Sequence, residues 1–181
     1  MRAISAILIL AAFVFIGGIS FAVERESGRE VAATVAHDIQ MYPKCRYSGM
    51  DRAVFAHTRM LIQYTDGSEA GTGSLRCASI DLVINFMKTV KSVQVGDYNT
   101  KKLIDAEKAY WVIGGKVPGV MTQNAKWAFA ERKDAEAFIK DNGGEISSYD
   151  EALAATYAGM FDDTLYLNAA MKNMKGHGHN H

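Results

Sequence analysis

The stretch MLIQYTDGSEAGTGSLRCA, Met60–Ala78, decides how the chain folds. Apolar and polar side chains alternate before its Asp-Gly pair, which predicts a strand within Val54–Tyr64 that has one buried face. Asp66-Gly67 is typical of a hairpin turn and leads into a second extended segment. Ser74 has the side chain of a helix N-cap, and the apolar spacing after it predicts a helix that reaches about Val90.

The second half of the chain repeats this order. Ala109–Ile113 and Lys126–Ala130 have the composition of strands and are separated by glycine-rich turns. A helix is expected over Asp134–Asn142, and it should stop at Gly143-Gly144, where glycine can adopt the left-handed cap conformation. Strand, turn, strand and helix therefore occur twice in succession.

A short extended segment, 145–148, and a last helix, Asp150–Ala158, complete the predicted core. The fold class is α+β, with two pseudo-repeated ββα-type halves and helices on one side of small antiparallel sheets. Such a repeat would place the turns that carry Met50 and Met121 in equivalent positions.

The first residues have the features of an export signal. One arginine is followed by an apolar run, Ile4–Ile19, and by small residues at Ser20 and Ala22. We expect residues 1–22 to be a signal peptide that is cleaved after Ala22, so that the mature protein is periplasmic. An uncleaved membrane anchor is the alternative, because the run is long enough to span a bilayer. A lipid-anchored N-terminal cysteine is excluded, since no cysteine lies at the cleavage point.

The composition describes an ordered globular protein. Hydrophobic residues make up 49% of the chain, which contains only two prolines. Twenty basic residues balance twenty acidic ones, so no net field attracts nucleic acid or an anionic membrane.

Two interpretations of the two cysteines, Cys45 and Cys77, stay open. A pair of cysteines in an exported chain forms a disulfide by default. The alternative is that both stay reduced and bind metal. Cys77 would then lie in the first turn of its helix, where the helix dipole favours the metal-binding thiolate.

Two methionines follow glycine-containing turns. Met50 ends the segment KCRYSGM, 44–50, and Met121 ends VPGVM, 117–121. Thiolate and thioether ligands select soft Cu(I) over harder divalent ions. If the fold brings the two turns together, the sequence predicts a copper(I) site.

The segments that carry these residues resemble the NosL family of nitrous-oxide-reductase accessory proteins. The similarity covers about residues 42–156 and rests on Cys45–Arg52, Phe55–Met60, Ser74–Ala78, Ala109–Gly115, Val117–Met121, Ala128–Ala130, Ala135–Phe138 and Gly143–Glu145. The resemblance implies an exported copper chaperone of denitrification that delivers copper to the reductase. It also implies two related ββα halves, a fold that an organomercurial lyase shares.

The chain departs from the family pattern at two positions. The first family motif is Cys-x-x-Cys-Gly-Met, and its second cysteine is Ser48 here. A further cysteine of the most similar subgroup is replaced by Gly73. A four-thiolate zinc site cannot form without these cysteines. The soft donors that remain, which favour copper or a disulfide, are Cys45, Met50, Cys77 and Met121.

Histidines are the weaker candidates for metal binding. His57 is expected at a strand start, either as a ligand or as a hydrogen-bonded structural residue. The C-terminal histidines His177, His179 and His181 alternate with other residues in a glycine-containing end, which could collect a divalent ion or be a disordered end. Arg52 and Arg59 are interpreted as solvated or salt-bridged, with a docking surface as the alternative.

We divide the chain into a signal peptide, 1–22, an N-terminal segment, 23–41, a NosL-like metal-binding domain, 42–158, and a Met- and His-rich tail, 159–181. The predicted function is an exported Cu(I) carrier whose partners are copper and a copper-receiving protein such as nitrous oxide reductase or its assembly proteins. A disulfide-stapled structural or docking protein is the alternative. The sequence contains no enzyme motif. The shared fold leaves one enzymatic alternative, an organomercurial lyase that would use both cysteines and Asp51.

Overall fold

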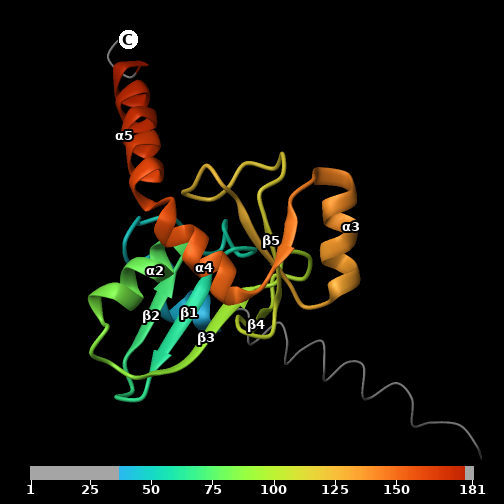
Figure 1. Ribbon diagram of the computed structural model, residues 1–181. Coiled ribbons are helices and arrows are strands. Elements are labelled where there is room, and N and C mark those ends of the chain that lie inside the picture. The colour runs from blue at the N-terminus through green and yellow to red at the C-terminus, as the bar shows by residue number, and fades with distance from the viewer. Residues whose placement is uncertain (1–36, 178–181) are drawn as a thin grey trace, which may run out of the picture.

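The computed structural model describes residues 37–177 (Figure 1). The predicted signal peptide, most of the predicted N-terminal segment, His179 and His181 lie outside these residues. The strands form a four-stranded sheet, β2-β1-β3-β4, and a three-stranded sheet, β6-β5-β7, which confirms the α+β class. Their bounds are β1 Met60–Tyr64, β2 Glu69–Thr72, β3 Val90–Gly96, β4 Leu103–Asp105, β5 Tyr110–Ile113, β6 Lys126–Phe129 and β7 Glu145–Ser147. The helices are α2 Leu75–Ile84, α3 Arg132–Asn142, α4 Tyr149–Ala158 and α5 Met160–His177.

The internal repeat is present, and β7 matches the predicted extended segment 145–148, whereas β3 and β4 of the first half were not predicted. β1 pairs antiparallel with β2 and β3, and β5 pairs antiparallel with β6 and β7. Each half is therefore a ββαβ unit in which the first strand is central. The repeat does not relate the two methionine turns, because Met50 precedes β1 whereas Met121 lies between β5 and β6. The expectation of equivalent positions is wrong.

The first helix is shorter than predicted. It ends at Ile84, and Asn85 caps it by donating from both its backbone and its side chain to the Asp81 carbonyl. The chain then turns back into β3, whose first residue pairs with the last residue of β1. Phe86 and Met87 have helical spacing and fall within the predicted helix, but they lie beyond the end of α2 and are 77% and 83% exposed. Pairing in the sheet thus overrides the helical pattern after residue 84.

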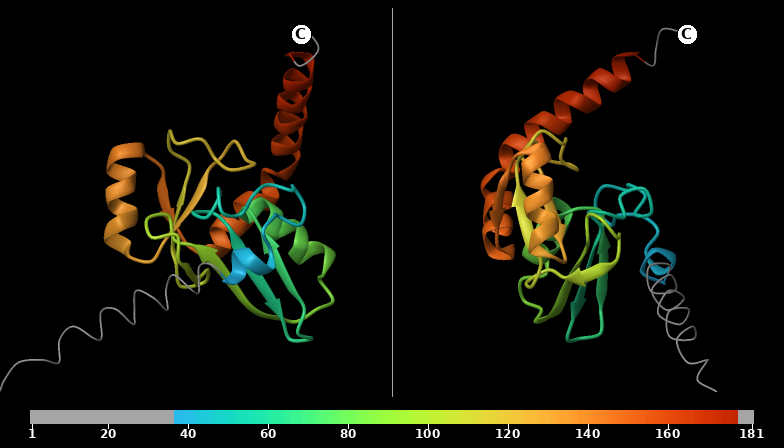
Figure 2. Two further views of the ribbon diagram at one scale, coloured as in Figure 1. Left: turned by 180° about the vertical axis from the view of Figure 1, so that it is seen from behind. Right: turned by 90° about the vertical axis from the view of Figure 1, so that its right-hand side faces the viewer.

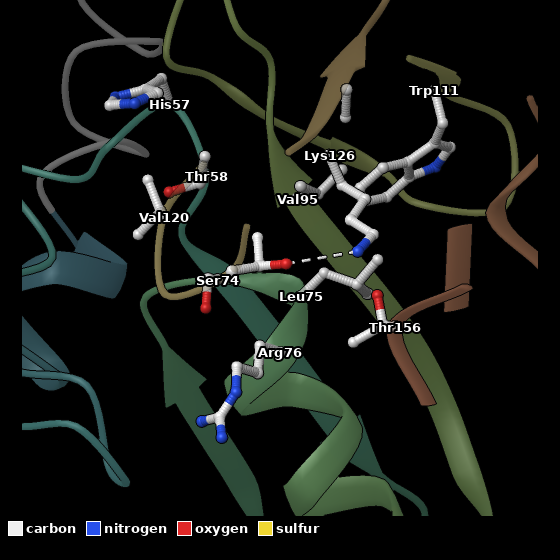
Figure 3. A pocket seen from close by; sticks show the side chains of 12 residues that line it. His57, Thr58, Ser74, Leu75, Arg76, Val95, Trp111, Val120, Lys126 and Thr156 are labelled. Carbon is white, nitrogen blue, oxygen red and sulfur yellow. Dashed lines mark hydrogen bonds between the residues drawn. The ribbon is translucent and has the colours of Figure 1, made fainter. Parts of the chain in front are cut away.

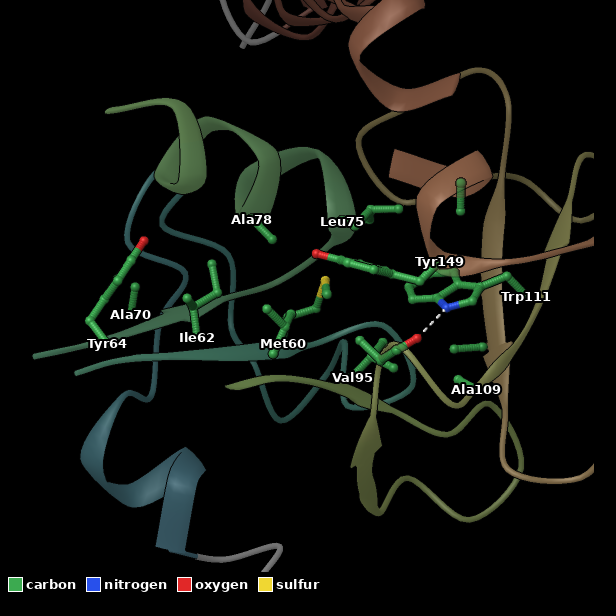
Figure 4. Packing of buried hydrophobic residues seen from close by; sticks show 14 residues of the cluster. Met60, Ile62, Tyr64, Ala70, Leu75, Ala78, Val95, Ala109, Trp111 and Tyr149 are labelled. Carbon is green, nitrogen blue, oxygen red and sulfur yellow. Dashed lines mark hydrogen bonds between the residues drawn. The ribbon is translucent and has the colours of Figure 1, made fainter. Parts of the chain in front are cut away.

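The main core lies where the two sheets meet α2 and α4. α2 packs on β1 and β2 and against α4, and α4 packs on β5. Figure 4 shows Met60 and Ile62 of β1 on one side of this core and Trp111 of β5 on the other. The Trp111 indole donates to the Ala106 carbonyl at 2.9 Å, so its polar atom is satisfied.

A second, smaller core covers the other face of β5 and β6. It joins Val112, Trp127 and Phe129 to Ala135 and Phe138 of α3. The three-stranded sheet is therefore covered by α4 on one face and α3 on the other, on opposite sides of β5 in Figure 1. The prediction of helices on one side is wrong for this sheet.

Helix α5 was not predicted. The tail expected from residue 159 begins as a helix that runs to His177 and extends away from the two sheets (Figure 2). Its first turns are attached to the core, since Asp163 Oδ1 accepts from the Gln123 amide at 2.8 Å and Thr164 accepts from Arg76 at 2.8 Å. Within residues 37–177, no helix combines the length and the apolar character needed to cross a bilayer.

Candidate copper site

The fold brings the two cysteines of the chain together. Cys45 and Cys77 are unbonded thiols that are 3% and 1% exposed. The hydrogen bond from the Cys77 thiol lowers the pKa of the Cys45 thiol well below its ordinary value, although burial opposes the shift. The same hydrogen bond, together with burial and the Cys45 charge, raises the pKa of Cys77. The contact therefore favours the thiolate at Cys45 over that at Cys77, and the thiolate is the form that binds a metal.

Cys45 lies in a tight loop, 44–51, closed by backbone hydrogen bonds. The Cys45 amide donates to the Met50 carbonyl at 2.8 Å, and the Gly49 amide donates to the Cys45 carbonyl at 2.9 Å. Gly49 has φ +70°, a conformation that other residues rarely adopt. Ser48 hydrogen-bonds Cys45 through both its side chain and its backbone. The predicted glycine turn thus closes around Cys45, and its hydrogen bonds hold the backbone of Met50 beside the backbone of Cys45.

Cys77 occupies the third position of α2. The Ser74 side chain accepts a hydrogen bond from the Cys77 amide at 3.5 Å, which confirms the predicted N-cap. Cys77 also lies in the first helical turn, as expected. The helix dipole favours a negative charge at this end, but the hydrogen bond to Cys45, burial and the Cys45 charge raise the pKa of Cys77, so the predicted thiolate at Cys77 is wrong.

Both positions that depart from the family pattern border the thiol pair. A Cβ atom at Gly73 would lie 3.4 Å from Cys45 Cβ and 3.8 Å from Cys45 Sγ. The Ser48 hydroxyl contacts both Cys45 and Cys77. Four positions distant in sequence therefore converge on one site, and in this chain only two of them carry sulfur.

A buried ionic network that sequence analysis missed holds this region to the four-stranded sheet. Asp38 Oδ2 accepts from Arg52 at 2.8 Å and from Arg59 at 2.9 Å, and both guanidinium groups are fully buried. Arg52 also donates to the carbonyls of Thr72 and Met60. Of the interpretations of the two arginines, the salt-bridged one is confirmed and the solvated one is wrong, because both side chains are fully buried. Asp38 could not be identified as their partner from its position in the chain.

A second polar contact ties the loop to α2. Asp81 is fully buried, and its two carboxylate oxygens accept hydrogen bonds from the Tyr47 and Tyr64 hydroxyls. Asp81 lies one helical turn after Cys77, so the two side chains share a helix face. An acidic residue on the apolar face of a predicted helix was the available signal for this contact.

The other half of the molecule approaches the site through the loop of Met121. Val120 and Thr122 line a cavity together with Ser74 and Arg76, the residues just before Cys77 (Figure 3). Met121 itself is half-buried and has φ +61°, an uncommon conformation for a residue with a side chain. The loop thus faces the N-terminal end of α2 from across the boundary between the halves.

His57 lines the same cavity but makes mainly aromatic contacts. Its ring stacks on Trp127 with centroids 5.8 Å apart and meets Tyr98 edge-on at 5.8 Å. Burial and the charge of Lys101 lower the pKa of His57, which favours neutral imidazole. Among residues 37–177, no three His, Cys, Asp or Glu side chains come together as a metal cluster. His177 ends α5, outside the loops that form the thiol site.

Comparisons with known proteins agree with the sequence motifs. The family model NosL matches residues 18–156. The crystal structure of the copper chaperone NosL from Shewanella denitrificans shares 25% sequence identity, covers 60% of this chain and 87% of that chain, and gives a TM-score of 0.49. No curated protein matches the chain. Because the NosL model spans the thiol site and both repeat units, the chain belongs to the NosL family.

Proposed function

We propose that the protein is an exported copper(I) carrier that works in the periplasm and passes copper to nitrous oxide reductase or its assembly proteins. Membership of the NosL family supports a copper-binding chaperone role. The observation that carries the proposal is the buried Cys45–Cys77 pair, in which one sulfur is held as a thiolate. Such a pair suits Cu(I), which accepts two or three soft ligands, and lacks the four ligands of structural zinc.

We assign one role to each of the soft donors. Cys45 supplies the strong thiolate, and Cys77 keeps its proton and its hydrogen bond to that sulfur. Met50 adds a thioether from the same loop as Cys45. Met121 adds a second thioether from the loop of the other half, whose neighbours line the cavity beside Ser74 and Arg76. Thioethers stay neutral, so they add soft coordination without adding buried charge.

Competition between the reduced protein and a Cu(I) chelator tests this assignment. Wild type should withdraw one equivalent of copper, Cys45→Ser should lose the tight binding, and Met50→Leu with Met121→Leu should weaken it. Met87→Leu is the matched control, since this methionine lies beyond the C-terminal end of α2 and is 83% exposed. Unchanged affinity in the double methionine variant would remove Met50 and Met121 from the site.

A disulfide-stapled structural or docking protein is the second candidate function. The contact between the two thiols favours it, because oxidation of adjacent thiols would close the loop between residues 45 and 77. Mass spectrometry of protein taken directly from the periplasm separates the two functions. A two-hydrogen deficit with no bound metal supports the staple, and a reduced copper-bound form supports the carrier.

We propose no enzymatic role. A carbon–mercury lyase would need Asp51 as the proton donor beside the two cysteines. Asp51 is exposed, and its carboxylate accepts from the amides of Ala53 at 2.7 Å and Val54 at 3.2 Å. It therefore caps the turn that follows it. An organomercurial turnover assay tests this assignment, and we expect no product above the uncatalysed rate.

A further inference from the structure

The candidate copper site is closed to solvent. The Cys45 and Cys77 side chains are 3% and 1% exposed, and loop 44–51 carries one of them over the other. A carrier exchanges copper through ligands that a donor or an acceptor protein brings to the metal. Those ligands reach two buried sulfur atoms only when the loop lifts away from α2.

The base and the tip of the loop are held differently. At the base, Lys44 and Asp51 form a backbone bridge. Next to the tip, the Arg46 amide donates to the Gly71 carbonyl of β2 at 3.1 Å. At the tip, the Tyr47 hydroxyl reaches across to α2 and donates to Asp81 Oδ1. Tyr47 stands between Cys45 and Ser48, so this side chain ties the part of the loop that faces Cys77 to the helix that carries it.

The acceptor of this hydrogen bond is held within the core. Asp81 is fully buried, and its other oxygen accepts from the Tyr64 hydroxyl of β1 at 2.5 Å. Asp81 and Cys77 lie one turn apart on the same helix. When the tip opens, Asp81 stays in α2 and loses the hydrogen bond from Tyr47, one of the two tyrosine hydroxyls that donate to it. Hydrogen bonds to a charged group stabilise by a factor of about ten or more in equilibrium constant.

We infer that Tyr47 is a positioning residue whose hydrogen bond to Asp81 latches the Cys45 loop over Cys77 and sets the rate at which copper enters and leaves. This inference rests on the proposed copper-carrier function. Tyr47 touches neither copper nor the partner's ligand in this arrangement. It acts by holding Cys45 beside Cys77, and the open loop presents both sulfur atoms to the partner.

Two conservative variants separate a latch from a general stabilising contact. Tyr47→Phe and Tyr64→Phe each remove one hydroxyl group from the same carboxylate, but only Tyr47 lies in the loop. Hydrogen exchange of the full reduced chain without copper measures loop opening directly. We expect the Arg46 amide, whose hydrogen bond to the Gly71 carbonyl joins the loop to β2, to exchange about tenfold faster in Tyr47→Phe and at the wild-type rate in Tyr64→Phe.

Copper release gives the second readout. Transfer of Cu(I) from the loaded protein to a chelator is followed by the loss of thiolate-to-copper charge-transfer absorption. We expect about tenfold faster release from Tyr47→Phe, with the same copper stoichiometry and the same absorption spectrum as wild type. Asp81→Asn keeps the side-chain shape without the charge, so it should accelerate release in the same direction.

The outcomes distinguish the latch from the function on which it rests. Equal acceleration in Tyr47→Phe and Tyr64→Phe shows a loss of overall stability and overturns the latch. Wild-type rates for Tyr47→Phe in both assays also overturn it and leave copper binding intact. If the wild-type protein fails to bind Cu(I), the carrier function fails, and hydrogen exchange still decides whether Tyr47 holds the loop closed.

Discussion

Placing cysteine at Ser48 and Gly73 should convert the candidate copper site into a zinc site. The structure places both positions against the thiol pair, with a Cβ at Gly73 3.8 Å from Cys45 Sγ. Two thiolates on one tetrahedral zinc, each with a Zn–S bond of about 2.3 Å, lie roughly 3.8 Å apart. A cysteine side chain at position 73 adds one further bond from its Cβ, so its sulfur can reach this separation without moving the backbone.

The cost of the change to the apo protein should be small. The nearest atom to the new Cβ, Cys45 Cβ at 3.4 Å, is at ordinary van der Waals distance. Replacing a glycine whose backbone conformation other residues tolerate stabilises the folded state by about 0.4–1 kcal/mol, because it lowers the conformational entropy of the unfolded chain. We therefore expect the reduced, metal-free Ser48→Cys, Gly73→Cys variant to unfold within about 1 kcal/mol of wild type.

Thermal unfolding with and without zinc provides the assay. Zinc at a hundredfold excess over its Kd stabilises the native state by about 2.7 kcal/mol, which corresponds to a rise in Tm of roughly 5–11 °C for a chain of this size. The matched control, Ser48→Ala with Gly73→Ala, adds the Cβ at position 73 without sulfur and should show no rise. An unchanged Tm of the four-cysteine variant in zinc, with all thiols reduced, would refute the convergence of these positions on one site.

Three further predictions test the surroundings of the site. Asp38→Ala should lower the free energy of unfolding, measured in urea, by about 3–5 kcal/mol, because it leaves two buried guanidinium groups without their carboxylate. Asp105→Ala is the control: it removes an exposed ion pair and should cost less than about 1 kcal/mol. Burial lowers the pKa of His57, so its contribution to stability is complete above pH 6.5, the unfolded value, and is lost as the pH falls below it; His57→Phe should flatten this part of a stability profile between about pH 5 and pH 8. If the C-terminal histidines collect divalent ions, deleting residues 176–181 should abolish weak Cu(II) or Ni(II) binding in calorimetry and leave Cu(I) binding intact, and divalent binding at full strength after the deletion would contradict this role.

Local chemistry accounts for the parts of the fold that the sequence predicts well. The Asp66-Gly67 turn, the Ser74 N-cap and the Gly143 stop each depend on one or two residues whose backbone preferences act where they stand. The sequence also identified four soft sulfur donors, Cys45, Met50, Cys77 and Met121. These features require no knowledge of distant contacts.

The sheets show where local patterns stop being sufficient. The apolar spacing of Phe86 and Met87 fits a helix, yet pairing between β1 and β3 ends α2 at Ile84 and leaves both side chains exposed. The three-stranded sheet is buried on two faces because α3 and α4 both cover it. The apolar periodicity of a helix predicts which side of that helix is buried, but not which face of the sheet the helix covers.

The candidate site depends most on the tertiary structure. The sequence by itself determined that Cys45, Met50, Cys77 and Met121 exist and which metal they would prefer. Only the fold decided that the two cysteines meet as a buried thiolate–thiol pair. Only the fold set Ser48 and Gly73 against that pair, and only it made Asp81 the partner of Tyr47. The physical reason is that these contacts join residues far apart in the chain, and their energies depend on burial and on distances that sequence spacing does not specify.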